Sequence, residues 1–109
     1  MVWLPRPRRD VHPWGNPVPI TSRSEFEAVV VQVAIKVDKA LYERGQVPAL
    51  EEARRTLEKV VRCSKDPVQL KALRQTLDGA TEAICAEIDG DPKLRDDLWD
   101  CLDYLDYRI

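Results

Sequence analysis

Apolar residues recur at helical spacing along four stretches of the chain. In an amphipathic helix the apolar positions return every three or four residues, whereas a half-buried strand alternates them. Pro48, Pro67 and Pro92 each stand just before one of these stretches. Proline suits the first helical turn, because its missing N–H would be unpaired there. The pattern therefore predicts four helices, three of them opened by proline.

The first predicted helix covers residues 24–44. Two overlapping Ser-x-x-Glu patterns at its start are typical of a capping box, and Gly45 is a stop signal. Residues 29–37 also alternate apolar and polar side chains as a strand would, and valine favours strands. The caps and a stripe that continues to Leu41 favour the helix. Valine and isoleucine occur on several sides, so we expect this helix to be the most buried.

The other predicted helices run from Pro48 to near Cys63, from Pro67 to about Ile88, and from Pro92 toward the C-terminus. The third keeps its apolar phase through Gly79, which predicts one continuous helix; a break at Gly79 is the alternative. The connections are short enough to make successive helices antiparallel neighbours. The predicted fold class is all-α, an antiparallel four-helix bundle over residues 24–109, with an open array of helix hairpins as second choice.

Residues 1–23 form a different kind of segment, a Pro/Arg/Trp-rich N-terminal arm. Five of the eight prolines fall within its first 19 residues, and residues that precede proline are pushed toward extended conformations. The arm also carries Trp3 and Trp14, a large apolar mass for a solvated tail. We therefore expect an irregular arm that packs on the bundle.

Charge is unevenly distributed although the net charge is only −2. Residues 1–23 carry four Arg against one Asp, whereas residues 91–109 carry six Asp against one Lys and two Arg. The small net charge gives no whole-chain argument for nucleic-acid or membrane binding. No stretch approaches the length of a membrane span. The three cysteines lie at helical positions and are odd in number, which favours reduced thiols and a cytoplasmic location.

Catalytic and metal-binding patterns are weak in this sequence. His12 is the only histidine, the cysteines show no Cys-x-x-Cys spacing, and no phosphate-binding glycine loop or nucleophile elbow is found. We therefore expect no enzyme activity, no metal site and no cofactor.

The last predicted helix carries the candidate binding surface. Asp96, Asp100 and Asp103 share one face, with Asp97, Tyr104 and Tyr107 beside them. Acids near a helix C-terminus oppose the helix dipole, so helix stability does not explain them. Aspartates steer a basic partner and tyrosines supply contact area. The pattern predicts a protein-interaction module with a basic protein partner, such as an immunity-type inhibitor or a small adaptor or regulator.

The arm offers the alternative. Arg6, Arg8 and Arg9 stand near Trp14, and arginine with aromatic side chains can bind nucleic acid. Three arginines are few for tight phosphate binding. A nucleic-acid-associated protein is therefore the second hypothesis.

Overall fold

The computed structural model describes residues 19–88 and 90–108, and all regular structure in these residues is helical. The helices are α1 (Arg23–Arg44), α2 (Pro48–Arg62), α3 (Pro67–Ala72), α4 (Arg74–Glu87) and α5 (Pro92–Tyr107). The all-α prediction is confirmed, and residues 29–37 are helix rather than strand. The described residues form five helices rather than a clear four-helix bundle.

The helix boundaries follow the capping signals of the sequence. The Ser22 hydroxyl accepts a hydrogen bond from the Glu25 amide (3.2 Å) at the start of α1. Gly45 ends that helix at φ 81°, where glycine avoids the strain of a Cβ, and its amide donates to the Leu41 carbonyl (2.8 Å). At the start of α5, Asp91 accepts from the Leu94 amide (3.0 Å). Local capping interactions thus set these three boundaries.

The prediction of one helix from Pro67 to Ile88 is wrong, because the chain bends at Leu73. That residue has φ −87° and ψ −4°, and its amide donates to the carbonyls of both Gln69 (3.0 Å) and Leu70 (3.1 Å). Such a tightened turn separates α3 from α4. Gly79, the alternative break point, lies inside α4.

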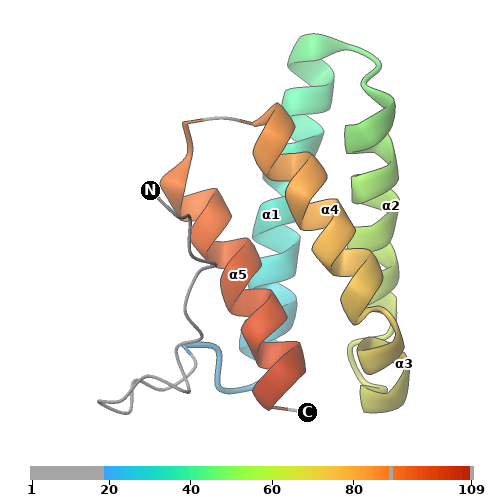
Figure 1. Cartoon of the computed structure of the whole chain (residues 1–109), viewed down its shortest axis with the longest axis vertical. Helices are drawn as coiled ribbons and strands as arrows, with labels where there is room; N and C mark the ends of the chain where they lie inside the picture. The colour runs from blue at the N-terminus through green and yellow to red at the C-terminus, as the bar shows by residue number, and fades with distance from the viewer. Residues whose placement is uncertain (1–18, 89, 109) are drawn as a thin grey trace, which may run out of the picture.

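The four longer helices surround a common core. The chain runs up α1, down α2, up α4 and down α5, with α3 at the foot of α2 and α4 (Figure 1). α1 packs against α2 and α5, and α4 packs against the same two helices. The largest fully buried side chains come from every helix and include Phe26, Leu50, Leu57, Leu70, Leu77, Ile84, Leu94, Leu98, Leu102 and Leu105.

The outer side of α1 corrects a second expectation. Val30, Val33 and Val37 are buried, yet Val31 is 39% exposed and Ile35 is 54% exposed. The apolar residues on several sides of α1 therefore do not mean that this helix is enclosed by its neighbours.

Ion pairs join α5 to its neighbours at both ends. Near its C-terminus, Arg74 of α4 binds the Asp106 carboxylate through two nitrogens (2.9 and 3.0 Å). This hydrogen bond and the charge of Asp106 raise the pKa of the Arg74 guanidinium against the opposing effect of burial. Near its N-terminus, Lys36 of α1 binds Asp91 (3.1 Å).

The predicted arm lies mostly outside the described residues, which begin at residue 19. Of the arm residues that the structure describes, Ile20 belongs to the core, since it is only 3% exposed and lies in the buried cluster. The prediction that Trp3 or Trp14 packs on the helices falls outside the described residues.

Candidate binding surface on α5

The six predicted binding residues of α5 divide between two sides of the helix. An α-helix completes one turn every 3.6 residues, so residues spaced three or four apart lie on the same side. One narrow stripe of α5 therefore holds Asp96, Asp100, Asp103 and Tyr107. This stripe is opposite Leu94, Leu98 and Leu105, which are buried in the core. We call these four residues the outer face of α5.

Tyr104 and Asp97 lie on the side of α5 toward α1. The Tyr104 ring is 5% exposed and stacks on Phe26 of α1, with ring centroids 4.6 Å apart and an interplanar angle of 19°. Asp97 is half-buried and binds the Lys93 ammonium group (3.3 Å). The prediction that Tyr104 belongs to an exposed surface is wrong, because this ring helps to hold α1 and α5 together.

Exposure is greatest at the two ends of the outer face and lowest between them. Asp96 is exposed and Tyr107 is 41% exposed, whereas Asp100 is half-buried and Asp103 is only 1% exposed. Of the three aspartates predicted to bind a partner on this face, Asp103 is therefore not accessible. It stands nine residues after Leu94, roughly two and a half turns along the helix, and so points away from the core.

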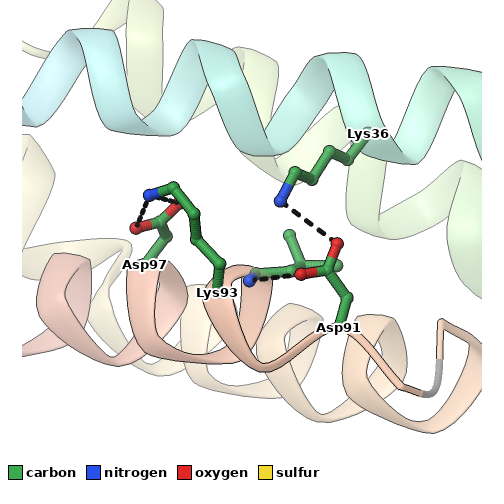
Figure 2. Close-up of polar contacts among 5 residues, drawn as sticks. Lys36, Asp91, Lys93 and Asp97 are labelled. Carbon is green, nitrogen blue, oxygen red and sulfur yellow. Dashed lines mark hydrogen bonds and ion pairs between the residues drawn. The ribbon is translucent and has the colours of Figure 1, made fainter.

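Two lysines missed by the sequence reading lie where α1 meets the first turns of α5. A cavity of about 170 Å³ lies between these helices, with Lys36 and Lys93 in its lining. Figure 2 shows each ammonium group directed at a carboxylate, Lys36 at Asp91 and Lys93 at Asp97. The two pairs balance charge in this crevice. The i, i+4 spacing of Lys93 and Asp97 on one helix could have predicted their ion pair. The pair of Lys36 and Asp91 could not be predicted in this way, because these residues are 55 positions apart in the sequence.

Asp91 combines a cap with an ion pair. The hydrogen bond from the Leu94 amide, and then the one from Lys36, lower the pKa of the Asp91 carboxyl below its ordinary value of 3.8. The carboxylate therefore fixes the start of α5 against α1 in its ionised form (Figure 2).

Two cysteines, Cys85 and Cys101, pack in or against the core. Cys101 is 1% exposed, and burial raises the pKa of its thiol, with Asp100 and Asp97 adding to the effect. Burial also raises the pKa of the Cys85 thiol, although Arg95 opposes the shift. A protonated thiol is a poor nucleophile and a poor metal ligand. In the described part of the chain, no three His, Cys, Asp or Glu side chains gather as a metal site would need.

The alternative site of Arg6, Arg8, Arg9 and Trp14 lies outside the described residues, as does His12. Within those residues, no helix has the length and apolar character needed to span a membrane.

Comparison with known proteins adds no relative. No protein-family model matches the chain, and neither a curated protein nor a solved structure matches it.

Proposed function

We propose that the protein is a non-enzymatic interaction module that binds a basic protein partner through the outer face of α5. An immunity-type inhibitor of a cationic protein, or a small adaptor or regulator, would work in this way. The observation that carries the proposal is the accessibility of Asp96 and of Tyr107, which is 41% exposed, on the outer face of α5. A cationic surface on the partner would complement the negative charge of Asp96.

The exposed residues of the outer face are the ones that we expect to contact the partner. Asp96 and Tyr107 are accessible to a partner, one as a charge and the other as an aromatic anchor. A charge at such a surface mainly accelerates association, and salt weakens its effect. We therefore expect binding that slows as salt is added.

Affinity capture with matched variants tests this proposal. The immobilised full-length chain is compared with a variant that combines Asp96→Asn and Tyr107→Ala, and with Glu82→Gln as control. Glu82 is an exposed acid on α4, so the control removes one negative charge at a different surface. We expect the wild type and the control to retain the same basic protein from nuclease-treated lysate, and the α5 variant to lose it.

Two results would contradict the proposal. Equal capture by the α5 variant and the wild type would place the binding surface elsewhere. Capture that disappears on nuclease treatment, and that requires Arg6, Arg8 and Arg9, would favour the nucleic-acid hypothesis instead.

A further inference from the structure

The outer side of α1 carries a row of exposed apolar residues. Val31 is 39% exposed, Ile35 is 54% exposed and Tyr42 is 91% exposed. Ala28, one turn before Val31, is exposed as well. Successive members are three, four and seven residues apart, so they lie along one side of the helix. This spacing is typical of a helix that packs on a second helix, and we call these four residues the α1 stripe.

Opposite charges stand along one edge of the α1 stripe. Glu25, Gln32 and Lys39 are spaced by seven residues, so they form a row of their own beside the stripe. All three side chains are exposed. The row therefore begins with an acid, has a neutral amide at its centre and ends with a base.

A second copy of α1 in antiparallel orientation complements this row. In an antiparallel pair related by a two-fold axis, the same edges of the two helices adjoin, and positions equally far from the centre face each other. With Gln32 at the centre, Glu25 of one copy faces Lys39 of the other, and the symmetry repeats this ion pair. A parallel pair would set Glu25 against Glu25 and Lys39 against Lys39. The charges therefore favour the antiparallel pair.

The same register packs the α1 stripe on itself. Near the two-fold axis, Val31 of each copy lies against Ile35 of the other. Toward the ends, Tyr42 lies opposite Ser24 of the other copy and leans toward its Ala28, because helical side chains point toward their own N-terminus. These two small residues leave room for the ring. Apolar side chains that are exposed in the single chain thus lose their contact with water.

From these observations we infer that the chain forms an antiparallel homodimer through the outer side of α1. The inference goes beyond the proposed function, because the interface uses no residue of the outer face of α5 and each dimer presents that face twice. One helix pair buries less than the roughly 800 Å² per partner of a standard interface. The dimer should therefore be weak and depend on protein concentration.

Sedimentation velocity of the full-length chain over a series of concentrations tests the inference. We expect the average mass to rise from that of one chain toward that of two. Val31→Glu should raise the dissociation constant roughly tenfold or more, because it sets two like charges near the apolar centre. Val68→Glu is the matched control, since Val68 is 79% exposed on α3, away from the stripe, and should leave dimerisation unchanged. Circular dichroism checks that both variants keep their helices.

A charge exchange tests the antiparallel register. Lys39→Glu leaves one variant with acids at both positions, and Glu25→Lys leaves the other with bases at both. Each variant alone should dimerise more weakly than the wild type, because like charges then face each other. An equimolar mixture of the two should associate again, since every facing pair is then opposite in charge.

Three results would overturn the inference. These are a wild type that stays a single chain at every concentration, a Val31→Glu variant that dimerises as the wild type does, and a mixture that associates no better than its two components. The first result would leave the α1 stripe to a different partner. None of them affects the proposal for α5, because the affinity capture does not depend on dimerisation.

Discussion

Single residues show most clearly where local chemistry decides the structure. Gly45 has φ 81° and Gly90 has φ 85°, so both stand at turns that disfavour other residues. Gly79 is different, because it lies inside α4 with ordinary helical neighbours. A Cβ added there would meet nothing within 4 Å, so the small residue does not serve a close helix contact.

Gly79→Ala should therefore stabilise the protein. Alanine favours a helix interior over glycine by about 1 kcal/mol, and the open space beside α2 accommodates the methyl group. For a domain of this size, thermal melting should shift upward by about 4–8 °C. Gly45→Ala is the matched control and should lower the melting temperature, because its φ of 81° strains an alanine. A lower melting temperature for Gly79→Ala would show that α2 and α4 approach more closely than the structure indicates.

Asp91 gives the protein a defined response to acid. The pKa of its carboxyl is lowered in the folded state, first by the Leu94 amide and then by Lys36. The stability that depends on the ionised form is present above pH 3.8 and is lost as pH falls below that value through the lowered pKa. Asp91→Asn keeps an oxygen acceptor for the cap but removes the charge.

We expect the melting temperature to fall less between about pH 6 and about pH 3 in Asp91→Asn than in the wild type. Glu82→Gln, which removes an exposed acid of α4, should keep the wild-type pH response. An identical acid response in Asp91→Asn and wild type would mean that Lys36 and Leu94 do not favour the ionised form.

At the scale of elements, the sequence predicted helices where a local signal marks them. The caps at Ser22 and Asp91 and the stop at Gly45 are side-chain or glycine effects within a few residues, so they can be read without knowing the fold. The bend at Leu73 carries no such signal, because the apolar stripe continues in phase across it. Packing of the short α3 at the foot of α4 and α5 accompanies this bend, and that is a tertiary property.

The candidate surface on α5 was only partly predictable for the same reason. Periodicity places Leu94, Leu98 and Leu105 in the core, and the structure confirms this. Periodicity alone does not predict that Tyr104 stacks on Phe26, since the two rings are far apart in the sequence, and it does not predict that Asp103 is buried. The side of a helix that lies between core and solvent is where sequence patterns discriminate least.

At the scale of the whole molecule, charge is distributed unevenly along the chain, since residues 1–23 carry four Arg against one Asp and residues 91–109 carry six Asp against one Lys and two Arg. The described chain begins at residue 19, Ile20 is buried, and Phe26 of α1 stacks on Tyr104 of α5. Packing of the arm on the helices, as the sequence predicts, would bring its arginine charges into contact with the folded domain. A contact of this kind has a larger electrostatic part than the apolar core, so the two should respond differently to salt.

Salt should therefore separate the arm contact from the rest of the fold. Between about 0.1 M and about 1 M salt the Debye length shortens from about 10 Å to about 3 Å, which screens exposed and half-buried charges. If the arm packs on the helices through its arginines, added sodium chloride should lower the melting temperature of the wild type more than that of a variant with Arg6, Arg8 and Arg9 changed to Gln. Both proteins keep the Arg74–Asp106 and Lys36–Asp91 pairs, so the difference between them isolates the arm. The variant should also melt below the wild type at low salt, and the two should converge at high salt. Parallel salt curves for the two proteins would mean that the arginines do not contribute to the stability of the fold.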